Sequence, residues 1–349
     1  MSLKSSIPIL KPKLFRVCLR QARYTCESSS IIGRDFISPE DFSAKDIKKF
    51  LWIAKDFKHS KGVKCSQILG GIRNCNATVI MAKPQVYCQV SISNALHYLG
   101  CSTNLVIDEN WEKSSCGITD LGRALSKITN VIIAVGCHHD SVIALRDGAS
   151  VPVVNFKSSS FQLLACLGNL LTVQECYGFL KGLKIAWIGP SHAALYTYIF
   201  LSPKLNMNIQ FTATCGEDQV ENQDLLQIAI RYASKCGAEV TQCLEAKDAV
   251  YRAHAIITTR HSFPELQITR EMLSQAAVNW SFLHHLPRSD IEACADVFKS
   301  KNSLVWEGYE NQMWTFMAVI VSLLSGYEPS SKMPDFDGCN VPPEKFYQP

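Results

Sequence analysis

The chain has 349 residues, of which 47% are apolar and 19% are charged. This composition is typical of a folded protein and excludes an intrinsically disordered one. The length is too great for one ordinary hydrophobic core and suits two domains. No run of 18 consecutive apolar residues occurs, which excludes a membrane-spanning helix. The formal net charge is +4, and the position of this excess decides whether it indicates an anionic partner.

The positive charge is concentrated at the amino terminus. Six Lys and Arg residues precede the first acidic residue, Glu27, and serines and apolar residues lie between them. An Arg-rich, Ser-rich and acid-poor segment is typical of a mitochondrial transit peptide, and a disordered basic tail is the alternative interpretation. We predict that residues 1–30 are a transit peptide and that the protein resides in the mitochondrial matrix. Their removal takes away six positive charges and one negative charge and leaves −1, so composition does not support binding to nucleic acid.

Helical and strand-like segments alternate from residue 40 onward, which predicts an α/β fold. Ser43 precedes an amphipathic segment and is the expected N-cap of the first helix. Further helices are expected at residues 91–99, 119–128, 161–177, 192–201, 223–236, 245–251 and 311–325. Strands are expected at residues 78–82, 104–107, 131–135, 151–155, 184–189, 209–212, 239–241, 255–258 and 280–283.

The order of these elements predicts two doubly wound parallel-sheet domains joined by connecting helices. We expect an N-terminal domain at residues 31–165 and a C-terminal domain at residues 166–328. The linking helix would be the one at 161–177, and the helix at 311–325 would close the fold. The last segment, residues 329–349, is expected to be a loose tail, because it contains Pro329, Pro334, Pro342 and Pro343.

Without reference to any family, the motifs that could carry chemistry are weak. The fifteen cysteines form no CxxC pair, and we predict neither a metal site nor a cofactor. Residues 189–192 (Gly-Pro-Ser-His) lack the further glycines of a phosphate-binding loop and favour an ordinary strand-to-helix connection. Residues 138–140 (His-His-Asp) favour a solvated turn. The best candidate is the segment 283–288, because ligand sites in α/β folds lie at the carboxyl ends of strands.

That segment is also the most recognisable part of the chain. Residues 279–288 read Asn-Trp-Ser-Phe-Leu-His-His-Leu-Pro-Arg and resemble the Asp-Trp-Thr-Phe-Leu-His-Cys-Leu-Pro-Arg signature of ornithine transcarbamylases. The resemblance covers residues 33–328 and includes Gly-Arg-Asp-Phe at 33–36, Asp-Leu-Gly-Arg at 120–123, Leu-Thr-Val-Gln-Glu at 171–175 and Trp-Thr-Phe-Met-Ala-Val at 314–319. It implies a carbamoyl-phosphate domain, an ornithine-binding domain, a trimer with shared active sites, and a relation to arginine biosynthesis and the urea cycle.

The residues that carry the chemistry of this family are mostly replaced. The family places Ser-Thr-Arg-Thr-Arg at the start of a helix, where this chain has Gln-Val-Tyr-Cys-Gln. Its later arginines, its His-Pro-x-Gln motif, its substrate-binding asparagine and aspartate and its signature cysteine are also replaced. The positions that match these substrate-binding motifs are Gln85, Val86, Tyr87, Cys88, Gln89, Val135, Gln162, Ala165, Ala193, Thr259, His284, His285, Leu286 and Gln312. Only His284 and Leu286 among them keep the residue of the family.

These replacements predict a loss of catalysis. Transfer of a carbamoyl group from a dianion needs donors on the phosphate and on the carbonyl oxygen as charge builds up. Truncating one buried, charge-paired group costs about 2–5 kcal/mol, and the family motifs lose four arginines here. Lys83, Lys157 and Arg123 are nearby in the sequence pattern, but a lysine does not reproduce a bidentate guanidinium. We therefore expect a mitochondrial ornithine-transcarbamylase-like pseudoenzyme with no intact catalytic residue.

The expected assembly is a homotrimer without a cofactor, nucleic acid or membrane insertion. A surviving pocket between the domains would be neutral and aromatic, because Tyr87, Gln89, Gln162, His284, His285 and Gln312 would line it, and it would not bind phosphonate bisubstrate mimics. Two alternatives remain open. In the first, the chain is an active ornithine carbamoyltransferase or a relative that uses another acceptor amine. In the second, it is a regulatory subunit that enters trimers of an active relative.

Overall fold

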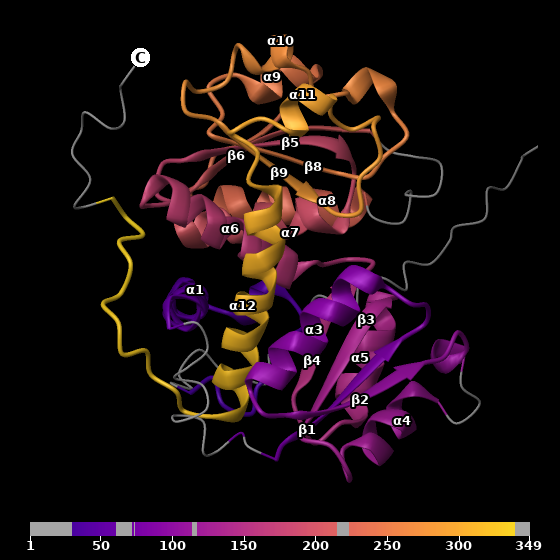
Figure 1. Cartoon of the computed structure of the whole chain (residues 1–349). Helices are drawn as coiled ribbons and strands as arrows, with labels where there is room; N and C mark the ends of the chain where they lie inside the picture. Colours follow the sequence, from indigo (N-terminus) through magenta and orange to yellow (C-terminus); the bar gives the residue numbers. More distant parts are fainter. Residues whose placement is uncertain (1–29, 61–71, 73, 114–116, 215–222, 339–349) are drawn as a thin grey trace, which may run out of the picture. The chain divides into compact units, whose positions relative to one another are not determined.

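The computed structural model describes residues 30–60, 72, 74–113, 117–214 and 223–338 (Figure 1). The predicted transit peptide at residues 1–30 lies almost entirely outside the described residues. Two parallel β-sheets form, one of four strands and one of five, and each has helices on both faces. This arrangement confirms the predicted α/β fold with two parallel-sheet domains. None of the helices in the described part of the chain is long and apolar enough to cross a membrane.

The first sheet has the strand order β2-β1-β3-β4. Its strands are β1 (Asn76–Met81), β2 (Ser102–Ile107), β3 (Val131–Cys137) and β4 (Val153–Ser158). The first five residues of β3 are all buried, as expected for a parallel strand that is covered on both faces. By contrast, every residue of the edge strand β2 is exposed.

Helices on both sides of this sheet explain why its apolar runs are continuous. The helices α4 (Ile118–Leu125) and α5 (His139–Gly148) pack against each other, and α5 also contacts β3 and β4. Alternate residues of β3, Ile132 and Ala134, join the apolar cluster under these helices. The helices α3 (Val86–Tyr98) and α6 (Leu163–Tyr177) contact β2 and β4 respectively.

The second sheet has the strand order β7-β6-β5-β8-β9. Its strands are β5 (Lys184–Pro190), β6 (Asn208–Thr214), β7 (Val240–Gln242), β8 (Ala255–Thr259) and β9 (Ser281–His285). The helices that follow or flank them are α7 (Ala193–Leu201), α8 (Gln223–Lys235), α9 (Ala246–Val250), α10 (Arg270–Leu273) and α11 (Ala295–Phe298). An apolar cluster that includes Ile188, Ile256 and Phe282 joins β5, β8 and β9 to the short helices that follow.

Two long helices, α1 (Ala44–His59) and α12 (Val305–Leu324), complete the core. The predicted cap is present, because Ser43 Oγ accepts a hydrogen bond from the N–H of Asp46. The helix α12 packs along α6 and also contacts α1 and α3. Gly168 of α6 permits the close approach, since a Cβ there would lie 2.6 Å from the backbone nitrogen of Gln312.

Three helices differ from the prediction. The helix α3 begins at Val86 and not at residue 91, and α12 begins at Val305 and not at residue 311. We predicted a solvated turn at residues 138–140, where α5 begins. None of the residues Gln85, His138 and Leu304, which precede these helices, makes a side-chain capping hydrogen bond. The usual sequence marker of a helix start is therefore missing at all three places.

The prediction of a loose tail is wrong for residues 329–338. The buried carboxylate of Asp56 in α1 accepts hydrogen bonds from Tyr327 Oη (2.6 Å) and from the N–H of Ser331 (3.1 Å). Trp52 Nε1 donates to the carbonyl of Ser331. The side chain of Phe336 is 3% exposed, and its carbonyl accepts from the N–H of Leu180. These contacts fix the segment across α1 and the connection between α6 and β5.

Candidate functional site

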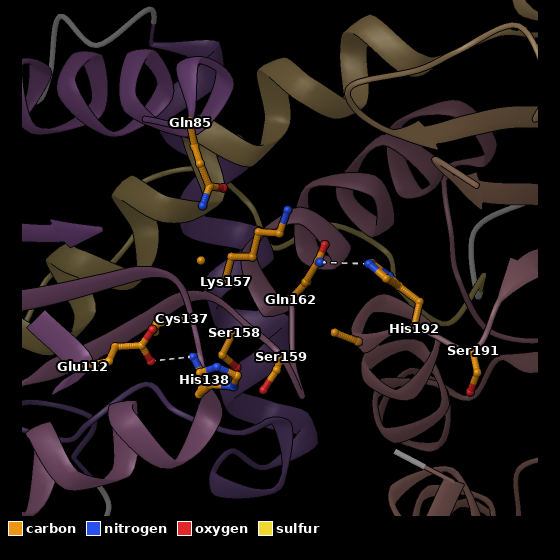
Figure 2. A pocket seen from close by; sticks show the side chains of 12 residues that line it. Gln85, Glu112, Cys137, His138, Lys157, Ser158, Ser159, Gln162, Ser191 and His192 are labelled. Atoms are coloured by element: carbon orange, nitrogen blue, oxygen red, sulfur yellow. Dashed lines mark hydrogen bonds between the residues drawn. The ribbon is translucent and has the colours of Figure 1, made fainter. Parts of the chain in front are cut away.

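A cavity of about 420 Å³ lies where several strands of both sheets end (Figure 2). Its walls are formed by Gln85, Glu112, Gln162 and residues 136–138, 157–159 and 191–193. These residues follow β1, β2, β3, β4 and β5, so the cavity is at the carboxyl ends of the parallel strands. Ligand sites of open α/β sheets lie at this position, and we therefore take the cavity as the candidate site.

Four helices begin at the wall of this cavity. Gln85, His138, Gln162 and His192 are the residues that directly precede α3, α5, α6 and α7. The N-terminus of a helix presents free N–H groups and a partial positive charge. The backbone alone therefore makes the cavity favourable for a negatively charged group.

Gln85 occupies the end of the cavity nearest to β3. The residue beneath it, Gly136, has a φ of +66°, and a Cβ there would lie 1.8 Å from Gln85 Nε2. A side chain at position 136 would therefore displace the amide of Gln85. Cys88 Sγ donates to Gln85 Oε1 over 3.7 Å, which holds the amide from the other side.

Lys157 and Glu112 are the two oppositely charged side chains of the wall. No carboxylate of a described residue lies within ion-pair distance of Lys157. Glu112 Oε1 accepts a hydrogen bond from the N–H of His138 (2.9 Å), as the dashed line in Figure 2 shows. Among the described residues, the cavity wall thus carries one cationic and one anionic side chain and no guanidinium.

The imidazole of His192 is held in a neutral state at the opposite wall. Its Nδ1 accepts from the N–H of Ala194 (3.2 Å), and its Nε2 lies 3.3 Å from Gln162 Nε2. The ring stacks on Trp187 at 6.0 Å between centroids. Burial, together with the nearby charge of Lys157, lowers the pKa of His192 to about 3. His192 therefore contributes hydrogen bonding and apolar surface and no positive charge.

Next to this wall, buried and uncharged side chains form a network of hydrogen bonds. Asn169 Nδ2 donates to Tyr198 Oη (2.8 Å), and Tyr198 Oη lies 3.0 Å from His285 Nε2. Burial raises the pKa of Tyr198 well above its ordinary value and lowers the pKa of His285 well below its own, so both groups are uncharged. His285, which replaces the signature cysteine, is a buried partner in this network and does not line the cavity.

His284 and Thr259 are also buried away from the cavity. His284 Nε2 lies 3.9 Å from Glu292 Oε2, and both side chains are almost fully buried. Burial lowers the pKa of His284 to about 4, although Glu292 opposes this shift. Glu292 in turn accepts from the N–H groups of Ser289 and His261. These contacts hold β9 against the loops that follow β8 and β9.

The structure brings together three of the predicted site residues, Gln85, Gln162 and Ala193, in the cavity wall. The others do not line it. Val86 and Tyr87 are exposed, Val135 is fully buried in β3, and Leu286 packs against the apolar cluster of the second sheet. The remaining positions outside the wall are Cys88, Gln89, Ala165, Thr259, His284, His285 and Gln312. The wall differs from the expected aromatic lining, because Tyr87, His284 and His285 lie outside it, while the opposite charges of Lys157 and Glu112 leave it without a net side-chain charge.

The displacement of Tyr87 has a clear cause. Its ring meets that of Tyr309 edge to face at 5.7 Å, and Tyr309 Oη donates to the carbonyl of Tyr87 (2.9 Å). The side chain is therefore used to attach α3 to α12.

Several wall residues were missed or undervalued at the level of sequence. Of the three basic residues considered as compensation, only Lys157 lines the cavity, since Arg123 is exposed and pairs with Asp120. Glu112 had no sequence signal, because it lies in a short turn after an edge strand. Ser191 and His192 belong to the connection that we predicted to be ordinary. Their position directly after the strand β5 is the sequence feature that indicates Ser191 and His192 as site residues.

Comparisons with known proteins agree with this geometry. The carbamoyl-phosphate binding domain model of aspartate/ornithine carbamoyltransferases matches residues 34–175, and the Asp/Orn binding domain model matches residues 181–323. The mitochondrial ornithine carbamoyltransferase of Aquarana catesbeiana is 29% identical over 91% of this chain and 94% of its own length. The mitochondrial ornithine transcarbamylase of Gallus gallus is 29% identical over 93% of this chain and 92% of its own.

Solved structures show the same fold. The ornithine carbamoyltransferase of Pyrococcus furiosus superposes with a TM-score of 0.77 at 23% identity and covers 86% of this chain and 99% of its own. A mitochondrial ornithine carbamoyltransferase from Coccidioides immitis superposes with a TM-score of 0.75 at 23% identity and covers 84% of this chain and 98% of its own. Two family models in tandem, curated relatives over nearly the whole length and a shared fold lead to one conclusion: the chain belongs to the aspartate/ornithine carbamoyltransferase family.

Proposed function

We propose that this chain is an ornithine-carbamoyltransferase-like protein that has kept the fold of its family and does not catalyse carbamoyl transfer. The observation that carries the proposal is the charge of the cavity. In the part of the chain that the structure describes, its wall contains Lys157 as the one Lys or Arg side chain and Glu112 as an opposing carboxylate. A phosphate dianion is held best by several charge-assisted donors, and bidentate guanidinium groups supply them most effectively.

The acceptor side of the site supports the same proposal. The positions that match the ornithine-binding motifs include Ala193, Thr259 and His285. Ala193 offers no polar side chain, Thr259 is buried, and His285 is bonded to Tyr198. A substrate ammonium would therefore meet no free carboxylate at these three positions.

The test is citrulline formation from carbamoyl phosphate and ornithine by the purified protein. The Gallus gallus relative serves as the active control, and a mixture without protein gives the background. We expect no citrulline above this background. A second arm measures phosphate release with a panel of other amines, because a relative with another acceptor would release phosphate without forming citrulline. Turnover in either arm contradicts the proposal.

We also propose that the chain forms a homotrimer through α3 and β2. Residues 86–107 contain no Asp, Glu, Lys or Arg, yet they expose Val86, Tyr87, Val90, Tyr98, Leu105, Val106 and Ile107. An exposed, uncharged edge strand beside an apolar helix face is suited to burial against another subunit. Light scattering after size exclusion is expected to give three times 38.9 kDa, and Val90→Asp is expected to give the monomer.

Two further parts of the proposal concern location and mixed assembly. Three curated relatives are named as mitochondrial proteins, which supports a transit peptide at residues 1–30 and residence in the matrix. Import assays with and without these residues test this, since only the full chain should enter mitochondria. Co-expression with the Gallus gallus relative tests whether the chain enters trimers of an active enzyme. Self-association alone would exclude that regulatory role.

A further inference from the structure

Lys157 and Glu112, two side chains of opposite charge, face the cavity, and the loss of catalysis assigns no ligand to them. Lys157 has no carboxylate partner among the described residues. Glu112 Oε1 is bonded to the N–H of His138, and its other oxygen accepts no hydrogen bond from the described residues. Both side chains line the same cavity and come from different connections of the first sheet.

The wall also holds hydrogen-bonding capacity that the chain itself leaves unused. Gln85 and Gln162 precede α3 and α6 without capping them, so the first N–H groups of these two helices are not satisfied by side-chain caps. Gln162 is only 5% exposed. One end of its amide lies against His192, and the other end has no hydrogen-bond partner among the described residues. This end is not among the buried side-chain atoms that lack a partner, so it is open to the cavity and available to a ligand.

We propose that the cavity binds a small zwitterion with one carboxylate and one ammonium group, and not a phosphate dianion. The carboxylate is placed at Lys157 and the N-terminus of α6, and the ammonium is placed at Glu112. The free end of the Gln162 amide bonds to the ligand between them. This proposal rests on the proposed function, because it assigns to the same cavity a ligand that does not react.

Charge balance decides between the two kinds of ligand. A dianion would be attracted by Lys157 and the helix N-termini but repelled by Glu112, whereas a zwitterion is attracted by both side chains. The His192 ring adds no charge, since burial keeps its pKa far below neutrality. A volume of about 420 Å³ also suits a small amino acid with a side chain or water beside it.

Calorimetric titration of the full chain at neutral pH and low salt tests this proposal. The zwitterionic probes are glycine, β-alanine and 4-aminobutyrate, which differ in the separation of their charges. Propionate, propylamine and inorganic phosphate are the probes with one type of charge. The tightest zwitterion is expected to bind at least tenfold more tightly than any of these three. Phosphate or propionate binding as tightly as the best zwitterion would overturn the proposal.

Two substitutions test the contributions of Lys157 and Glu112 separately. Lys157→Met is expected to weaken the zwitterion at least tenfold. Glu112→Gln keeps the acceptor for His138 and is expected to weaken the zwitterion while it strengthens phosphate. The matched controls are Lys127→Met and Glu109→Gln, which change exposed side chains outside the cavity and should leave all affinities within twofold. An unchanged ratio of zwitterion to phosphate in Glu112→Gln would overturn the proposal. The citrulline assay is independent of these titrations, so failure of the proposed function is distinguished from failure of this inference.

Discussion

The substitution Tyr198→Phe tests whether the position of the family's signature cysteine has become part of the core. The hydroxyl of Tyr198 is fully buried and bonds to Asn169 Nδ2 at 2.8 Å and to His285 Nε2 at 3.0 Å. Its removal leaves the shape of the side chain unchanged and deprives two buried groups of their partner. Each unsatisfied group costs about 1–3 kcal/mol, and Asn169 keeps a weak contact of 3.4 Å with His285. The expected loss of stability is therefore about 2–4 kcal/mol in total.

Urea unfolding followed by intrinsic fluorescence measures this loss. Tyr251→Phe is the matched control, because its side chain is 54% exposed and its change should stay within about 0.5 kcal/mol. The double variant Tyr198→Phe with His285→Leu separates the hydrogen bonds from simple packing, since it removes both polar partners. It should be less destabilised than the sum of the two single variants. A loss below about 0.5 kcal/mol in Tyr198→Phe would refute the network as we describe it.

Three further predictions concern stability and activity. His285→Cys is expected to destabilise the protein by about 1–3 kcal/mol without producing citrulline; measurable turnover would contradict the assignment of this position to the core. Asp56→Asn is expected to lower the free energy of unfolding by about 2–3 kcal/mol at pH 7, as measured in urea. The reason is that hydrogen bonds from Ser331 and Tyr327 outweigh the effect of burial and lower the pKa of Asp56. No effect would mean that residues 329–338 are not anchored through this carboxylate. Burial lowers the pKa of His139 to about 4 and that of His192 to about 3. The unfolded chain therefore binds more protons than the folded chain below pH 6.5. The urea concentration at the unfolding midpoint should decrease as the pH is lowered from 7.5 to 5. His139→Gln should reduce this dependence, and a midpoint independent of pH would contradict it.

The strands and long helices were predictable because their patterns are local. The run 131–135 is apolar throughout and forms a strand covered on both faces, and Ser43 caps the first helix as its sequence indicates. The start of α5 was not predictable, because His138 does not cap it and Glu112 bonds to its N–H from a distant turn. Contacts of this kind depend on the folded chain and leave no mark in the local sequence.

The site was predictable only in part for a related reason. Alignment to the family motif selected Gln85 and Gln162, which precede helices and line the cavity. It also selected Tyr87 and His285, which contact Tyr309 and Tyr198 and lie outside the cavity wall. A motif gives the position of a residue along the backbone. The direction of its side chain is set by packing, and replacement of a polar residue by an aromatic one changes that direction.

Binding of carbamoyl phosphate is the measurement that tests the central claim most directly. Calorimetric titration of the purified chain should show no saturable binding at micromolar concentrations, because the cavity offers one lysine opposed by Glu112. A stable phosphonate bisubstrate mimic should give the same result, with the Gallus gallus relative as the binding control. Micromolar binding of either compound by this chain would contradict the account, since the cavity would then hold the family's dianion without the family's arginines.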